Sequence, residues 1–322
     1  MNPRRPSRFA QLAALVATLA VATAFAFPEK PVRLVVPFAP GGGTDLIART
    51  LGQGMAKDLG QPIVVENKPG GGTIIGTDLV AKSPADGHTV LVATFAHAVN
   101  PSMQASLPYA PDKAFAPVIL VGRSPNVLVV RSDSPYRSVK DVIAAAKQSP
   151  GKLTYASFGS GTSAHLAGEL FTNLARINMV HVPYKGSGPA MTDVLGGQVD
   201  MIFGTAAGVA GHVSQGKLRA LGVTSPEPSS ALKGVPAIAE SVPGYEVESW
   251  YGLYVPAGTP PDRIARLHAA AKAAAQADEF RKRVEPEGLA ISAGAPAELD
   301  TYVRGEEARW RRVVKENNIK SD

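Results

Sequence analysis

The chain has 322 residues, 45% of them apolar, with no cysteine and a net charge of +6. Its basic and acidic residues are interspersed, which excludes the basic patch of a nucleic-acid-binding or membrane-surface protein. Without cysteine the fold has no disulfides and must be held by burial, and this length can supply two domains with cores of ordinary size.

The N-terminal segment has the pattern of an export signal. Three arginines precede an apolar run over residues 9–23, and an A-x-A cleavage sequence ends at Ala26. The alternative is a membrane anchor, but the run is short for a membrane span of about 20 residues. The sequence therefore predicts a signal peptide over residues 1–26 and a mature chain that begins at Phe27.

The mature chain opens with short β-branched runs that alternate with helical patterns. Ile47, Leu51 and Met55 recur every four positions and predict a buried helix face, and Gly60 ends that helix. The strand candidates are continuous apolar runs rather than alternating ones, which favours a parallel sheet covered on both faces. The predicted strands are 32–36, 62–66 and 89–94, and the predicted helices are 45–59 and 74–82.

A second α/β series begins near the middle of the chain. Two strands in quick succession, 117–122 and 126–132, precede it, and a strand-like segment over 249–258 follows it. Between them we predict strands 153–157, 179–182, 199–203 and 218–224 and helices 138–148, 163–175 and 189–195, and at the end helices 261–276, 278–288 and 296–316.

The second series is predicted to be inserted into the first. Lobe 1 would comprise residues 27–128 and 250–322 and lobe 2 residues 129–249, joined by two strand-like crossings. The alternative, two consecutive domains joined once, leaves the C-terminal helices without a sheet. Two lobes with two linkers can close like a hinge on a ligand in the cleft between them.

Each predicted lobe has a Gly-rich loop between a strand and a helix, "PFAPGGGT" at 37–44 and "FGSGTS" at 158–163. Glycine lets backbone N–H groups approach a ligand, and the first turn of a helix has unpaired donors with a partial positive charge. Both loops follow the carboxyl ends of strands, where open α/β sheets bind ligands, so the pair predicts an anion site. A second "PGGGT" at 69–73 is interpreted as a tight turn.

Other site chemistries fit less well. The loops lack the lysine of a phosphate-binding P-loop and the spacing of a dinucleotide-binding loop. No Asp, Glu and His cluster surrounds Asp45, which excludes a metal; this acid would stabilise the helix start, or meet an anion through water. Ser160 lacks the G-x-S-x-G context of a hydrolase, and Ser163 and His165 are too close to face each other on a helix. We therefore predict no catalytic residue, no metal and no cofactor.

Four side chains are further candidates for the cleft. Phe38 and Phe158 lie inside the two loops and are predicted to form its walls. Phe203 lies at a strand end, where core packing is the ordinary alternative. His97 follows a strand and is either a cleft residue or a hydrogen-bonding loop residue.

Several blocks of the mature sequence resemble one family, the Bug receptors, which are the periplasmic solute-binding proteins of tripartite tricarboxylate transporters. The similar blocks are "EKPVRLVVPFAPGGGTDLIAR", "LGQPIVVENKPGGGTIIG", "ADGHTVLVAT", "PGKLTYASFGSGTSAHLAGELF", "HVPYKGSGPAMTDVLGGQVDMIF", "GKLRALGVT" and "WYGLYVPAGTP". They follow the family's order over essentially the whole mature chain.

The resemblance implies an α/β, two-lobe periplasmic-binding-protein fold of type II, the Venus-flytrap form, with the ligand cleft between the lobes. It implies a monomeric periplasmic receptor, not an enzyme, that delivers a small carboxylate to membrane permease subunits. That ligand would be a di- or tricarboxylate, an acidic amino acid or an aromatic acid. The alternative is a receptor that signals to a membrane sensor without a dedicated permease.

The resemblance also implies which residues bind the ligand. In the family, two loops hold one carboxylate largely through backbone N–H groups and two ordered waters, and the residue matching Asp200 is often drawn into the site. The sequence departs from the family's pattern at "TFAHAVN" (94–100) and at Gly204, which leaves the ligand's second end unassigned. The matching loop residues are Phe38, Ala39, Pro40, Gly41 and Gly42 in lobe 1 and Phe158, Gly159, Ser160, Gly161, Thr162 and Ser163 in lobe 2.

Overall fold

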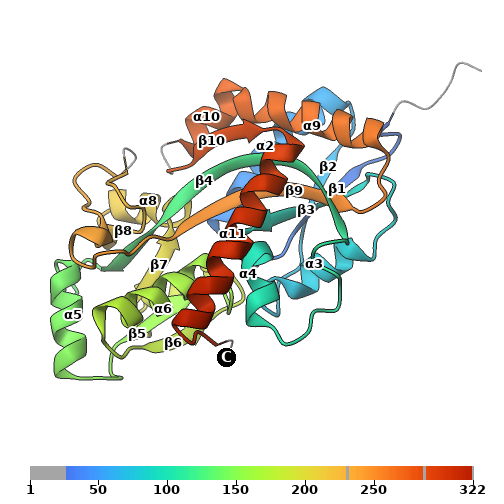
Figure 1. The fold of residues 1–322 in the computed structure, drawn as a ribbon. Coiled ribbons are helices and arrows are strands. Elements are labelled where there is room, and N and C mark those ends of the chain that lie inside the picture. The colour runs from blue at the N-terminus through green and yellow to red at the C-terminus, as the bar shows by residue number, and fades with distance from the viewer. Residues whose placement is uncertain (1–26, 230–231, 286–287, 321–322) are drawn as a thin grey trace, which may run out of the picture.

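The computed structural model describes residues 27–229, 232–285 and 288–320, and the predicted signal peptide over 1–26 lies outside the described residues. Figure 1 shows two α/β masses joined by long strands, with the C-terminal helix crossing in front of them. Within the described ranges, no helix combines the length and the apolar character needed to span a membrane.

Strand β4 (Phe115–Arg131) joins the two masses because it pairs within both. Up to Pro125 it pairs with β9 (Glu248–Pro256), and from Asn126 onwards it pairs with β7 (Met201–Thr205) and β8 (Leu218–Val223). We call the mass built on β9 and the first part of β4 lobe 1, and the mass built on β7, β8 and the rest of β4 lobe 2.

The remaining elements divide between the lobes in chain order. Lobe 1 also contains β1 (Val32–Val36), α2 (Gly43–Leu59), β2 (Ile63–Asn67), α3 (Ile74–Ala81), β3 (Thr89–Thr94), α4 (Phe95–Met103), α9 (Pro261–Gln276), α10 (Asp278–Val284), β10 (Ala290–Gly294) and α11 (Pro296–Glu316). Lobe 2 also contains α5 (Val139–Gln148), β5 (Thr154–Ser157), α6 (Ser163–Ala175), β6 (Val180–Pro183), α7 (Ser187–Leu195), α8 (Ala206–Ser214) and a short 3₁₀ turn, η1 (Ile238–Glu240).

The strands that carry the two Gly-rich loops are parallel to their neighbours. β1 pairs in parallel with β2 and β3, and β5 with β6 and β7. The helices α2, α3 and α4 in lobe 1 and α6, α7 and α8 in lobe 2 therefore start at the carboxyl ends of these strands. β9 runs antiparallel to β3 and to β4, so the sheet as a whole is mixed rather than parallel as the apolar runs predicted.

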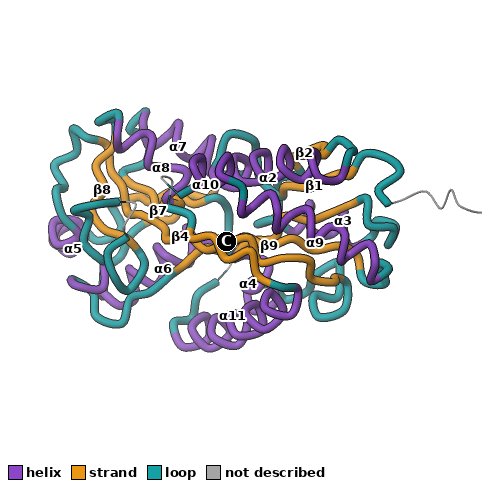
Figure 2. The backbone as a smooth tube through the Cα atoms, turned by 90° about the horizontal axis from the view of Figure 1, so that it is seen from above, coloured by secondary structure: helices purple, strands orange, loops and turns teal. Residues whose placement is uncertain are grey.

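Helices cover both faces of the central strands. Every residue of β3 is buried. In Figure 2, α11 lies on one side of the β4–β9 pair while α2 and α9 lie on the other, and both α9 and α11 pack on β4. This double cover explains why the strands are continuously apolar.

The predicted first helix is confirmed, and its sequence explains both its face and its end. Ile47, Leu51 and Met55 are each 1% exposed, as their spacing predicts for a buried stripe. Gly60 ends α2 in the left-handed conformation, with φ of 69°, and its N–H donates to the carbonyl of Ala56. Glycine adopts this conformation without the steric cost that a β-carbon adds.

Four elements also differ from the sequence prediction. The strands predicted at 117–122 and 126–132 are one strand, β4, which continues through Pro125 from one lobe into the other. α4, α8 and β10 were not predicted. α4 contains Pro101, and α8 contains two glycines, residues of low helix propensity, so tertiary packing overrides their local preference.

Candidate functional site

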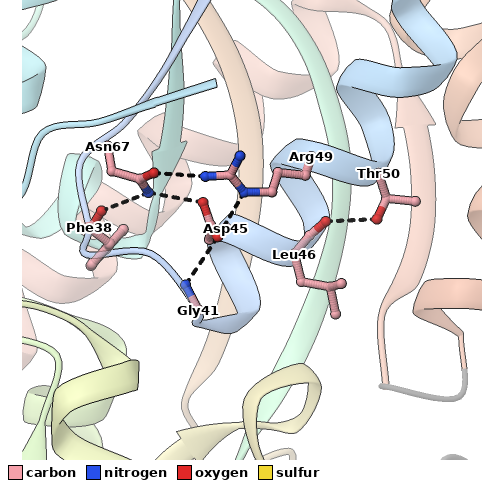
Figure 3. Close-up of polar contacts among 7 residues, drawn as sticks. All are labelled: Phe38, Gly41, Asp45, Leu46, Arg49, Thr50 and Asn67. Atoms are coloured by element: carbon pink, nitrogen blue, oxygen red, sulfur yellow. Dashed lines mark hydrogen bonds and ion pairs between the residues drawn. The ribbon is translucent and has the colours of Figure 1, made fainter. Parts of the chain in front are cut away.

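The loop over residues 38–42, here called loop 1, is held in place by Asp45 (Figure 3). Oδ2 of Asp45 accepts a hydrogen bond from the N–H of Gly41 at 3.1 Å, and its Oδ1 accepts one from Nδ2 of Asn67 at 2.9 Å. The same Asn67 amide donates to the carbonyl of Phe38 at 3.0 Å. Asp45 therefore holds loop 1 at Gly41 directly and at Phe38 through Asn67, and both of its carboxylate oxygens are occupied within the protein.

The surroundings of Asp45 keep its carboxyl group ionised. Burial by itself would raise the pKa of Asp45, which is 6% exposed. Hydrogen bonds from Arg49, at 3.0 Å, and from Asn67 and Gly41 outweigh the burial and hold the pKa below its ordinary value of 3.8. Since folding favours the ionised form, this stabilisation is present above about pH 4 and is lost as the pH falls further.

The loop over residues 158–163, here called loop 2, is turned by two glycines. Gly159 and Gly161 have φ values of 123° and 80°, which side chains rarely permit. The carbonyl of Gly159 accepts a hydrogen bond from Oγ1 of Thr162 at 2.6 Å, and the N–H of Gly161 donates to Nδ1 of His165 at 3.2 Å. These bonds fix the loop immediately before α6.

Loop 1 touches lobe 2 directly. The N–H of Ala39 donates to the carbonyl of Lys185 at 3.0 Å. A β-carbon placed on Gly42 would lie 2.0 Å from Oγ of Ser187, the first residue of α7. The two lobes are therefore closed against each other at loop 1, and a neighbour in lobe 2 leaves no room for a side chain at Gly42.

The second Gly-rich turn, over residues 70–73, also faces the other lobe, which corrects its interpretation as a turn alone. A β-carbon on Gly72 would lie 2.2 Å from the carbonyl oxygen of Ser160 in loop 2. Nδ2 of Asn100, in α4, donates to the carbonyl of Gly72 at 3.0 Å, and a β-carbon on Gly161 would lie 2.5 Å from Oδ1 of Asn100. This turn and Asn100 form a second contact between the lobes.

The starts of α2 and α6 each lie against the opposite lobe. Gly42 is the N-cap of α2 and Thr162 the N-cap of α6, and neither helix is capped by a side-chain hydrogen bond. The first-turn N–H groups have no partner within the helix and carry partial positive charge. Loops 1 and 2 contain no Lys or Arg, and Phe38 and Phe158 at their starts are each 7% exposed. The junction therefore offers neutral backbone donors beside buried aromatic rings.

A metal does not fit this arrangement. Within the part of the chain that the structure describes, no group of three or more His, Asp or Glu side chains is placed to hold a metal ion. The acid nearest to loop 1, Asp45, uses both carboxylate oxygens in the hydrogen bonds described above. The chemistry available is the binding of an anion by backbone N–H groups.

His97 packs inside lobe 1 rather than beside the two loops. Its ring centroid lies 4.8 Å from that of Tyr254 and 5.2 Å from that of Phe115. It is 7% exposed and borders a small cavity that Arg304 of α11 also lines. The structure thus gives His97 the role of a packed ring in α4, neither the cleft residue nor the hydrogen-bonding loop residue that the sequence offered.

Replacing His97 is expected to change stability in acid. Burial lowers the pKa of His97 to about 4. The unfolded chain takes up its proton near pH 6.5, so the native state is fully stabilised above that pH and loses about 3 kcal/mol as the pH falls toward 4. In urea unfolding between pH 6.5 and 4.5, His97→Phe should show a shallower pH dependence than the wild type. His268→Gln, at a half-buried histidine, is the control. If the free energy of unfolding of His97→Phe depends on pH as steeply as that of the wild type, the lowered pKa of His97 is contradicted.

Asp200 and Phe203 also lie away from the loops. Oδ2 of Asp200 accepts hydrogen bonds from the N–H and the Oγ1 of Thr154, both at 2.8 Å. Thr154 begins β5 whereas loop 2 follows the end of that strand, so the carboxylate lies at the opposite edge of the sheet. Phe203 is fully buried against Tyr155 and Phe171 in the core of lobe 2. Neither residue is carried into the candidate site.

Sequence reasoning missed the residues that position the loops. Arg49 had a local signal, because it lies four residues after Asp45 on one helix face. Asn67 ends β2 and Asn100 sits within the apolar segment of α4, and both reach loop residues that are distant in the sequence. For Asn100 the available hint was a lone amide in a largely apolar stretch, whereas Asn67 stands between Glu66 and Lys68 and had no such signal.

The comparison with known families decides the assignment. A family model described as "Tripartite tricarboxylate transporter family receptor" matches residues 47–319. The chain belongs to this family. Its members are periplasmic solute-binding receptors and not enzymes. Among its relatives is the protein BugT of Bordetella pertussis (strain Tohama I), 37% identical over 313 residues that cover 95% of each chain.

Solved structures of similar proteins have the same fold as this receptor. One is Rpa4515 of Rhodopseudomonas palustris with adipate, with a TM-score of 0.88, 34% identity and coverage of 92% of this chain and 100% of that one. Another is MatC of the same species with bound malate, with a TM-score of 0.86, 33% identity and coverage of 89% and 100%. The predicted α/β fold with two lobes, that of periplasmic binding proteins, is confirmed.

Proposed function

We propose that this receptor captures a small organic carboxylate between loops 1 and 2 and delivers it to the permease of a tripartite tricarboxylate transporter. The observation that carries the proposal is that the α2 and α6 helix starts both lie at contacts between the lobes, in loops without basic side chains. Such donors hold a carboxylate through backbone hydrogen bonds. Each bond to a charged group contributes about 1.5–3 kcal/mol, and a few of them with apolar contact reach micromolar affinity.

The proposed ligand contacts are those that the sequence singled out in the two loops. The N–H groups of Ala39 and Gly41 are already bonded to Lys185 and Asp45, so we assign the ligand to the N–H groups that follow them at the start of α2. The residues proposed to line the site around these N–H groups are Phe38, Ala39, Pro40, Gly41 and Gly42 of loop 1 and Phe158, Gly159, Ser160, Gly161, Thr162 and Ser163 of loop 2.

The similar structures support a dicarboxylate as the first ligand class to test. The two structures compared above hold adipate and malate, and each of these acids carries two carboxylates. We therefore place dicarboxylates ahead of tricarboxylates, acidic amino acids and aromatic acids for this chain.

The lobes are proposed to open and close about the two strand crossings. We place the boundaries where β4 changes partners, between Pro125 and Asn126, and at the start of β9, Glu248. These positions differ from the sequence-based boundaries by a few residues. Both loops belong to one chain, so we propose a monomer, exported by the signal peptide over residues 1–26 and acting in the periplasm.

A thermal-shift assay tests the ligand assignment. Protein stripped of carried-over ligand by unfolding and refolding is mixed with malate, adipate, glutamate or benzoate. At 100-fold excess over Kd, a ligand stabilises the native state by about 2.7 kcal/mol, and we expect a rise in midpoint of roughly 5 °C or more with at least one dicarboxylate. A flat response to all four acids would overturn the proposal.

A further inference from the structure

The start of α8 faces the start of α2 across the contact between the lobes. A β-carbon placed on Gly43, the first residue of α2, would lie 2.7 Å from Oγ1 of Thr205 and 3.3 Å from the backbone nitrogen of Gly208. Thr205 is the N-cap of α8, and its side chain makes no capping hydrogen bond. Two helix N-termini, each with partial positive charge, thus approach each other head on.

Two buried hydroxyl groups lie at this junction, one from each lobe. Thr205 is 5% exposed and Tyr251, in β9, is 1% exposed. Neither Oγ1 of Thr205 nor Oη of Tyr251 has a hydrogen-bond partner of ordinary geometry among the described residues. Burial raises the pKa of Tyr251 to about 12, an effect that the nearby hydroxyls of Thr205 and Ser249 offset in part. The hydroxyls of Thr205 and Tyr251 are therefore neighbours, but neither makes a hydrogen bond of ordinary geometry with the described residues.

When the lobes close, the buried hydroxyls and the facing helix N-termini are unfavourable unless a ligand atom lies between them. A buried hydroxyl without a partner loses its hydrogen bonds to water and gains none in return. The facing N-termini of α2 and α8 repel each other, and the repulsion grows as water is excluded. A negatively charged oxygen between them would accept hydrogen bonds from the hydroxyls. The partial positive charges at the two helix starts would attract it, which replaces their mutual repulsion with a favourable interaction.

We propose that Thr205 and Tyr251 are ligand-binding residues whose hydroxyls donate to an oxygen of the bound acid between the N-termini of α2 and α8. This inference rests on the proposed function and adds to it two contacts outside loops 1 and 2. Because one hydroxyl comes from each lobe, both contacts form in the closed state. The site therefore selects acids that place an oxygen at this junction.

Two variants that remove a hydroxyl without changing shape test the inference. Tyr251→Phe and Thr205→Val are titrated with malate, adipate, glutamate and benzoate in a calorimeter beside the wild type. We expect each variant to bind the acid preferred by the wild type at least about ten-fold more weakly, since each loses a bond to a charged group. Without ligand, their thermal midpoints should equal or exceed that of the wild type, because the removed hydroxyl had no hydrogen bond of ordinary geometry among the described residues.

Tyr245→Phe is the matched control. Tyr245 is 1% exposed, and its hydroxyl donates to the carbonyl of Ala167 at 3.0 Å. This variant should have a lower midpoint and unchanged affinity, the opposite of the result expected for Tyr251→Phe.

The outcomes separate the inference from the proposed function. Wild-type affinity in both Tyr251→Phe and Thr205→Val, with binding by the wild type intact, would overturn the inference and leave the proposed function standing. A fall in midpoint with unchanged affinity in Tyr251→Phe would show a structural hydroxyl and overturn it likewise. If the wild type binds none of the four acids, both proposals fail together.

Discussion

Gly42→Val is expected to weaken the binding of malate or adipate at least about 100-fold while the chain still folds. Gly42 has φ of −96° and ψ of 173°, an extended conformation that any residue adopts, so valine adds no backbone strain. The obstacle lies in the other lobe. A β-carbon on Gly42 would be 2.0 Å from Oγ and 3.4 Å from Cβ of Ser187. The serine hydroxyl can rotate away from one methyl group, but the γ-carbons of valine also meet the body of Ser187.

The measurement pairs titration calorimetry with urea unfolding of the ligand-free protein. A 100-fold loss corresponds to about 2.8 kcal/mol of binding free energy, whereas the free energy of unfolding should stay close to that of the wild type. Gly211→Ala is the matched control, since a β-carbon on this exposed glycine of α8 meets nothing within 4 Å. Unchanged affinity in Gly42→Val would remove loop 1 from the site.

Asp45→Ala is expected to destabilise the folded state by roughly 3 kcal/mol and to weaken ligand binding as well. The buried carboxylate accepts hydrogen bonds from Gly41, Arg49 and Asn67 at 2.9–3.1 Å. Its removal leaves the donors of Gly41 and Asn67 without their acceptor, and hydrogen bonds to a charged group contribute about 1.5–3 kcal/mol each. Loop 1 then loses the contact that sets the position of its N–H groups.

Urea unfolding at several pH values checks this expectation. The free energy of unfolding of Asp45→Ala should fall below that of the wild type by the whole expected amount at pH 6. This difference should shrink below about pH 4, where the wild-type carboxylate takes up a proton. Glu279→Ala removes an exposed carboxylate that pairs with Lys57 and is the control, for which we expect no measurable change. If the difference in free energy of unfolding between Asp45→Ala and the wild type persists at pH 2, a role for the ionised carboxylate is contradicted.

The local parts of the site could be predicted because their signals are local. The buried stripe of α2, its end at Gly60 and the Gly-rich junctions before α2 and α6 follow from residue spacing and from the conformations that glycine permits. The sequence also indicated that Asp45 would stabilise the helix start, and its bond to the N–H of Gly41 lies just before that start. Its other partner, Asn67, comes from a strand distant in the sequence.

The features that differ from the sequence-based expectation depend on which segments meet in space. The turn at 70–73 has no local sign that Gly72 contacts Ser160. Asp200 was assigned by resemblance, yet the strand direction of β5 places it at the edge opposite to loop 2. Phe203 lies at the end of its predicted strand and His97 follows one, as cleft residues would, but sheet pairing and helix packing place both rings in the cores of the lobes.

The sequence by itself determined the family, the alternation of strands and helices, and the two loops whose glycines expose backbone donors at helix starts. These properties depend on residue identity and on spacing within one segment. Only the tertiary structure decided that β4 passes unbroken through both lobes, that Gly42 lies against Ser187, and that Thr205 and Tyr251 share one junction. Each of these depends on the register and closure of distant segments, which no local pattern encodes.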